Sequence, residues 1–138
     1  MIDPLGFLLV TIRDNPAVNA IVAGRVRGGE LAEGDAAPAV VLRRLGVTRS
    51  PMGRTGRAGL EGVTISALCF GTTYVQAAQL YGAVSDAIHM KGPRRDASGR
   101  QIFLSVDESD GGAALDPDTR WPTETATIFV VAAAQPLS

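Results

Sequence analysis

Few residues of this chain have the type and spacing that catalysis requires. The 138 residues include one cysteine, Cys69, and one histidine, His89. Ser85 and Asp86 precede His89 in a segment of helical periodicity, where adjacent side chains point apart, so the three do not form a catalytic triad. Cys69 has no base near it in sequence. We therefore expect that the chain is not an enzyme.

Two glycine-rich segments suggest ligand binding, but neither has the required spacing. Asp107, Glu108 and Asp110 precede two glycines, yet Ser109 and Gly111 stand where a calcium loop needs oxygen ligands. Glycines also recur every third residue within residues 53–59, without the Lys-Ser/Thr ending of a phosphate-binding loop. We expect no metal and no cofactor.

Charge is nearly balanced in total but segregated along the chain. Thirteen basic and fourteen acidic residues give a net charge of −1, so any electrostatic function must be local. Residues 43–57 contain arginines and no acid, whereas residues 107–118 contain acids and no base. Opposite charges on one small domain suit head-to-tail self-association; alternatively both segments are solvated turns, or the arginines face nucleic acid without sequence choice.

The single tryptophan, Trp121, has two alternative roles: it anchors its loop on the core, or it anchors an interface. With the charged segments it completes our set of candidate interface or channel residues. These are Arg49, Arg54, Arg57, Asp107, Glu108, Asp110, Asp116, Asp118 and Trp121.

Three helices are expected to position these segments. Asp3 and Pro4 favour a first helix, and Asn15 followed by Pro16 caps a short second one that ends near Gly24. The third is predicted over residues 73–90, because Thr73 and Gln76 have the spacing of a capping box and an apolar stripe follows.

Four strands are expected at residues 39–45, 63–70, 101–107 and 124–133. The alternation in the second of them points Cys69 into the core. We predict one α+β domain over residues 1–138, with a four-stranded, mainly antiparallel sheet and two main helices packed on one face, in the order α(α)ββαββ. Residues 46–61 and 108–122 are expected to be flexible loops.

No secretory signal or membrane span is recognisable, because the N-terminal segment lacks a positive region and no apolar run approaches the roughly 20 residues that a spanning helix needs. We therefore expect a soluble protein that is not exported by the usual route.

Several local strings, taken in order, resemble the tail terminator, or tail-completion, proteins of long-tailed, siphovirus-like phages. A first helix runs into RDNPAV at residues 13–18, and VAGRV follows at residues 22–26. Pro38 opens a strand with AVVL, a second strand leads into the helix at residues 73–90, and the end of the chain is rich in strand residues. The resemblance covers nearly the whole chain.

The resemblance implies a structural protein of the virion. Such proteins form a hexameric ring that caps the head-proximal end of the tail tube, ends tube polymerisation and joins the tail to the connector or stopper of the head. The expected partners are other copies of the chain, the tail tube protein and the connector or stopper, with passive contact to the DNA that passes through the channel. Assembly would take place in the host cytoplasm. The alternatives are another neck or head-completion protein, or a small Arg-loop nucleic-acid-binding domain.

Overall fold

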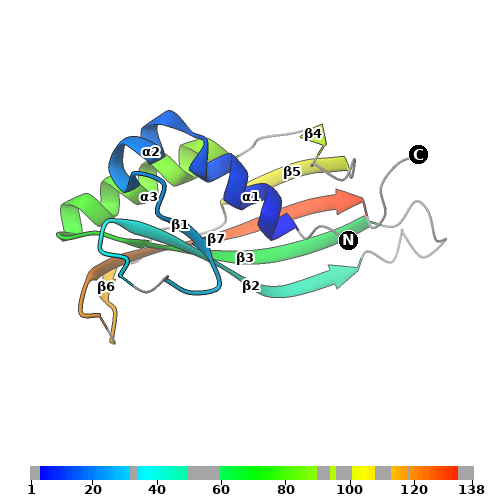
Figure 1. Cartoon of the computed structure of the whole chain (residues 1–138). Helices are drawn as coiled ribbons and strands as arrows, with labels where there is room; N and C mark the ends of the chain where they lie inside the picture. Colours follow the sequence, from blue (N-terminus) through cyan, green and yellow to red (C-terminus); the bar gives the residue numbers. More distant parts are fainter. Residues whose placement is uncertain are drawn as a thin grey trace.

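The computed structural model describes residues 4–31, 34–49, 60–89, 94–95, 101–107, 113–117 and 119–133, and it shows helices packed on one face of a sheet (Figure 1). The helices are α1 (Pro4–Arg13), α2 (Pro16–Val22) and α3 (Tyr74–Ile88). The strands are β1 (Val26–Gly28), β2 (Ala39–Arg49), β3 (Leu60–Phe70), β4 (Arg94–Arg95), β5 (Gln101–Asp107), β6 (Ala113–Leu115) and β7 (Pro122–Ala133). The α+β class predicted from the sequence is confirmed.

The described strands form one sheet in the order β1-β2-β3-β7-β5-β4, and β6 pairs with the beginning of β7. β1 runs parallel to β2, and the other described pairs are antiparallel. The four long strands are the four that we expected. The short strands β1, β4 and β6 were not expected, because two or three residues are too few to show a recognisable alternation.

Local hydrogen bonds explain where α2 begins and ends. The Asn15 side chain accepts from the backbone N–H groups of Ala17 and Val18, at 3.0 and 3.2 Å, which confirms the predicted cap. Ala23 takes the left-handed conformation that ends α2, with φ of 50°, one residue before the expected Gly24.

The start of α3 is capped by two neighbouring threonines. The Thr73 hydroxyl accepts from the N–H of Gln76 at 3.1 Å, as predicted. The Gln76 side chain accepts from the backbone N–H and the hydroxyl of Thr72, at 2.7 and 2.8 Å, so the returning half of the expected capping box closes one residue early. The helix ends at Ile88, with His89 as its C-cap, slightly before the expected residue 90.

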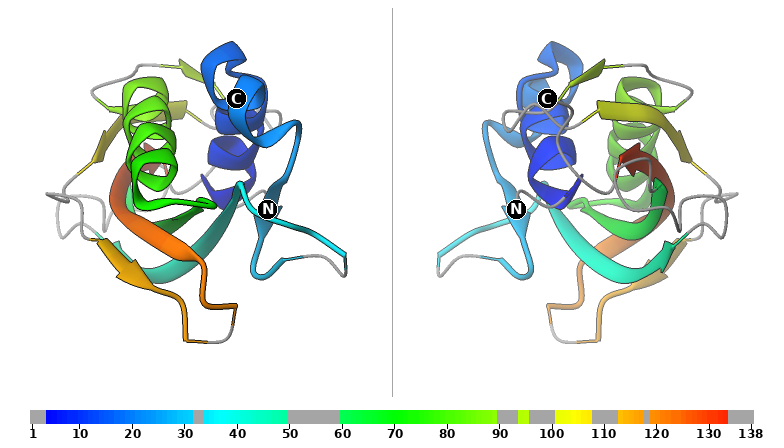
Figure 2. Two further views of the ribbon diagram at one scale, coloured as in Figure 1. Left: turned by 90° about the vertical axis from the view of Figure 1, so that its left-hand side faces the viewer. Right: turned by 90° about the vertical axis from the view of Figure 1, so that its right-hand side faces the viewer.

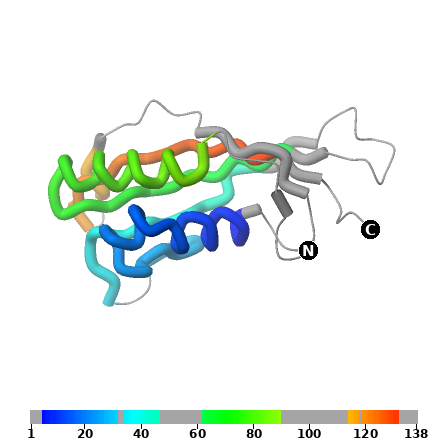
Figure 3. Tube along the Cα trace, turned by 90° about the horizontal axis from the view of Figure 1, so that it is seen from above, coloured from blue at the N-terminus to red at the C-terminus, as the bar shows by residue number. Residues whose placement is uncertain are grey.

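The helices lie side by side over the inner face of the sheet (Figure 3). α3 packs mainly against β7, and α1 packs mainly against β1 (Figure 2). No single described helix is long and apolar enough to cross a membrane, although α1 and α2 together reach the length and composition across a break bent by 81°.

The core lies between this helical layer and alternate residues of β3 and β7. Ile65 lies opposite Ile128 and Ala67 lies opposite Ala126, and all four are completely buried. Cys69 is also buried on this face of β3, which confirms its predicted orientation. The largest side chains that the helices add are Leu8, Ile12, Val18, Val22, Leu80, Val84 and Ile88. Each contributes about 1.5–3 kcal/mol by leaving water.

Our expected loop boundaries were too wide. β2 continues beyond Leu45 to Arg49 after a bulge, because the β-branched residues Val47 and Thr48 pair with the beginning of β3. The second expected loop, at residues 108–122, contains β6 and the first residue of β7. Residues 50–59 and 108–112 lie outside the described part of the chain.

Replacing glycine by alanine should change the free energy of unfolding in opposite directions at two positions. A Cβ at Gly71 would lie 2.5 Å from the backbone nitrogen of Ala77, whereas a Cβ at Gly82, within α3, would meet nothing within 4 Å. Gly71→Ala should lower the free energy of unfolding by about 1–3 kcal/mol or more, because backbone must move. Gly82→Ala should raise it by about 0.5–1 kcal/mol through helix propensity. Urea unfolding measures both; equal effects would contradict the description of the turn before α3.

Candidate assembly surfaces

The outer surface of the helical layer is almost without charge. Within the described helices, Arg13 and Asp86 are the only charged residues. A helix that faces water normally carries charged and polar residues on its outer side. The composition of this layer is instead typical of the interior of a protein–protein interface, where charged residues are depleted.

The most exposed apolar residues of this layer lie at the beginning of α3. Val75 is 67% exposed and Tyr74 is 47% exposed. At 100° per residue, Val75, Gly82 and Asp86 follow one line along the outer side of α3, opposite the buried Leu80 and Val84. This line, which we call the α3 ridge, combines exposed apolar surface, bare backbone and a single carboxylate.

A second exposed surface lies at the edge of β2. β1 pairs only with residues 40–42, so from Arg43 onward no described strand covers this edge. Arg43 and Arg44 are exposed, and Leu45, the extra residue at the bulge, is 61% exposed. These three residues, which we call the β2 edge, present an apolar side chain beside two guanidinium groups.

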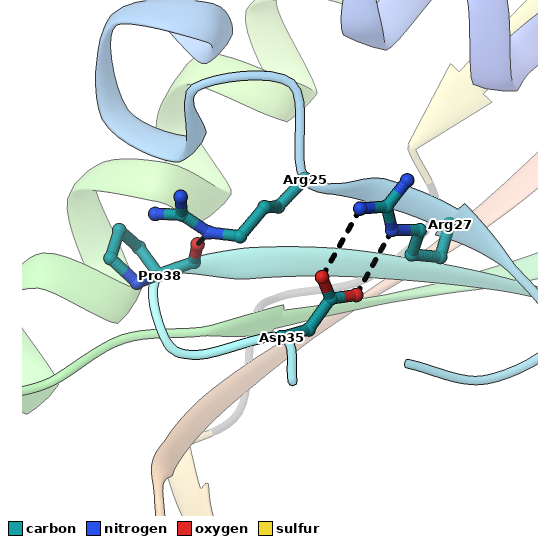
Figure 4. A network of polar contacts seen from close by, with 4 residues as sticks. All are labelled: Arg25, Arg27, Asp35 and Pro38. Atoms are coloured by element: carbon teal, nitrogen blue, oxygen red, sulfur yellow. Dashed lines mark hydrogen bonds and ion pairs between the residues drawn. The ribbon is translucent and has the colours of Figure 1, made fainter. Parts of the chain in front are cut away.

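The connection between β1 and β2 is held by three arginines. Arg27 donates two hydrogen bonds to the Asp35 carboxylate, at 2.9 and 3.1 Å (Figure 4). Arg25 donates to the carbonyl of Pro38 at 2.9 Å, and Arg43 donates to the carbonyl of Gly29 at 2.7 Å. These bonds fix the path of the connection beside the β2 edge.

The ion pair within this connection has unequal exposure. The Asp35 side chain is 8% exposed and that of Arg27 is 40% exposed. The hydrogen bonds and charge of Asp35 raise the pKa of Arg27 above its ordinary value, so the guanidinium stays charged at any physiological pH. The nearly buried carboxylate therefore always has a cationic partner.

A tight turn before β7 positions Asp116 and Trp121. The Asp116 carboxylate accepts from the backbone N–H and the hydroxyl of Thr119, at 2.8 and 2.9 Å. Arg120 takes a left-handed conformation, with φ of 64°, and its N–H bonds the carbonyl of Asp116 at 2.8 Å. The Trp121 ring packs edge-on against Phe70, with centroids 5.8 Å apart. This contact attaches the turn to the end of β3, as the loop-anchor alternative expects.

The predicted charged residues do not gather at one place. Arg49 lies at the end of β2, in register through Glu61 with Ala132 of β7. Asp116 lies in the turn before Pro122, ten residues and about 33 Å away along β7. Asp107 ends β5 at an intermediate position, opposite Ile128. Outside the described part of the chain lie Arg54, Arg57, Glu108, Asp110 and Asp118.

Cys69 and His89, the residues considered as a nucleophile and a base, lie in the core and at the end of α3. Cys69 is buried in the core, and His89, the C-cap of α3, donates its backbone N–H to the carbonyl of Ser85 at 2.7 Å. No group of three His, Cys, Asp or Glu side chains that could hold a metal occurs among the described residues.

Comparison with known proteins places the chain in a family. The family model described as "Tail completion protein gp17" matches residues 8–122. The chain belongs to this family. A gp17-type tail completion protein is a structural protein of phage tails, which confirms the class of protein that the sequence resembles. Among curated proteins, no sequence matches the chain.

A solved structure has the same fold as this tail completion protein. A chain in the structure titled "Virion of native gene transfer agent (GTA) particle" superposes with a TM-score of 0.65 over 92% of both chains. The two sequences are 13% identical, so the similarity is one of fold.

Sequence reasoning did not identify the most exposed apolar residues. Leu45 and Val75 lie within apolar stretches that suit a core, and only their three-dimensional positions expose them. A usable signal was present in α3, because a fifteen-residue helix with one charged residue is unusual on a protein surface.

Substitution of Asp35 tests whether its ion pair with Arg27 holds the connection between β1 and β2 in place. Asp35→Asn should lower the thermal unfolding midpoint by about 4–8 °C, because it removes the charge that faces Arg27 from a nearly buried site. It should also increase amide exchange over residues 29–38. The control is Asp14→Asn in the exposed 3.7 Å pair with Arg13, which should change the midpoint by less than about 2 °C. Equal shifts would show that Asp35 is not a structural residue.

Proposed function

We propose that this tail completion protein assembles into a ring, of six copies as the resemblance implies, that closes the head-proximal end of the tail tube and joins it to the head. The observation that carries the proposal, beyond family membership, is the placement of unlike surfaces on one subunit. The β2 edge is basic and lies level with Ile128, midway along β7, whereas the acidic residue Asp116 lies in the turn before Pro122, six residues away along β7. Contacts between different surfaces of identical subunits generate a ring when the rotation closes.

To end polymerisation of the tube, the ring must bind the tube end specifically and must not offer a binding surface to another tube subunit. One surface of the ring would bind the last tube subunits, and the opposite surface would not reproduce the surface to which another tube subunit adds. No bond needs to be made or broken. The protein would therefore act without catalysis, and the head connector or stopper would use the surface that the tube protein cannot.

The low number of charged residues in the helical layer supports a role inside an assembly. Val10, Tyr74 and Val75 are each at least 46% exposed in the single chain. Exposed apolar residues that lie among other uncharged residues are typical of surfaces that another protein covers. A ring between the tube and the head gives this layer protein neighbours in place of water.

The segments at residues 46–61 and 108–122 are proposed to contact the tube or the head. Their undescribed parts contain Arg54, Arg57, Glu108, Asp110 and Asp118. We keep the expectation, made from composition, that both segments are flexible: ordering a flexible residue on docking costs about 1–2 kcal/mol, so only a matching partner would stabilise the contact. Arginines near the channel could also touch DNA through its phosphates alone.

Deletion of residues 50–58 tests the tube-capping role. The variant should remain folded, because the deleted residues lie between the described ends of β2 and β3. Particles produced with it should have tails of variable length or unjoined heads, which electron microscopy measures. The deletion changes both the length and the charge of the segment. A variant with Arg54→Ser and Arg57→Ser removes charge but keeps the length, so a comparison of the two variants separates these effects. Normal, uniform tails with the deletion would refute the assignment of this segment.

A further inference from the structure

We propose that the β2 edge of one copy docks on the α3 ridge of the next copy around the ring. The β2 edge consists of Arg43, Arg44 and Leu45, and the α3 ridge consists of Val75, Gly82 and Asp86. The inference rests on the proposed ring and assigns the residues that hold its subunits together.

The two surfaces lie on different parts of the subunit. α3 packs mainly over β7, with further contacts to β3 and β5, whereas the β2 edge lies one strand beyond β3, toward the β1 end of the strand order. The end views show α3 over β7, α1 beside β1, and β2 starting next to β1 and curving beneath the helices (Figure 2). A contact between different surfaces repeats from copy to copy, as a cyclic ring requires.

Shape and apolar surface fit between these two sites. Leu45 is 61% exposed at a bulge, where the chain departs from the regular path of the strand. On the α3 ridge, Val75 is 67% exposed, and the space beside Gly82 is open. A projecting leucine can therefore approach the helix backbone at Gly82, and other parts of the same neighbouring copy would cover Val75, about 10 Å away along α3. Both apolar side chains would leave water in the same contact.

Charge is complementary at the same place. Arg44 pairs across the sheet with Ile65, whose side chain is in the core, so Arg44 lies on the same side of the sheet as the helices. Asp86 is exposed and is the only acidic residue of the described helices. Among the described residues it makes no ion pair. A neighbouring Arg44 would supply the opposite charge at the level of the helical layer.

A second copy is favoured over the tube protein as the occupant because both halves of the contact are on this chain. The edge offers one apolar residue with positive charge, and the ridge offers apolar surface with one negative charge. If the tube protein used the ridge instead, exchanging the charges of Arg44 and Asp86 would not restore assembly. The two occupants therefore give different results for substitutions at the edge.

Exchange of the two charges tests the contact. Arg44→Asp and Asp86→Arg should each weaken assembly at least about tenfold, because each places like charges together. The double variant should recover most of the loss. Assembly is measured on the full chain by native mass spectrometry and light scattering over a range of concentrations, alone and with tail tubes, and circular dichroism checks folding. Failure of the double variant to recover, with both single variants folded and impaired, would overturn the pairing of Arg44 with Asp86.

Gly82→Gln tests the steric part without a change of charge. A glutamine at this open helix position should leave the fold intact and weaken assembly at least about tenfold, because it fills the space that Leu45 would use. Ala20→Gln, at an exposed position of α2, is the matched control and should assemble normally. Rings that form equally well with Gly82→Gln and both charge variants would overturn this contact and leave the proposed function standing. A wild-type chain that forms no ring, alone or on tubes, would overturn the proposed function itself.

Discussion

The pairing of β3 with β7 is the constraint on which the rest of the structure depends. Eleven residue pairs join these strands without interruption, from Leu60 opposite Ala133 to Phe70 opposite Thr123. Because side chains alternate between the two faces, a slip of one residue between the strands would move either Ile65 or Ile128 from the core to the other face. The register therefore decides which face receives the helices. It also sets how far the basic end of β2 lies from the acidic turn before β7.

The sequence alone was sufficient to predict structural features whose physical cause is local. The side chains of Asn15 and Thr73 accept hydrogen bonds from residues two or three positions later in the sequence. The starts of both helices could therefore be predicted from neighbouring residues. The alternation in β3 also placed Cys69 in the core. The charged segments were recognised as opposite in sign. Their separation could not be foreseen, because it depends on the register of β7 with β3 and on the length of β7.

The remaining features depend on residues that are far apart in sequence or on very short elements. β1 is three residues long and exists through its pairing with β2, fourteen positions later. The bond from Arg43 to Gly29 has the same separation, and no spacing rule predicts it. Exposure of Leu45 results from the bulge and from the early end of β1. These nonlocal effects determine the surfaces on which assembly would depend, while local rules determine the scaffold.

The burial of Cys69 makes this chain convenient for site-specific labelling. Its thiol is the only one in the chain and is completely buried beneath the helices, so reagents that modify accessible thiols should leave the folded protein untouched. A single cysteine introduced on the surface would then accept a fluorophore or a spin label without prior removal of the native thiol. Donor and acceptor dyes on neighbouring subunits could follow the order in which copies associate.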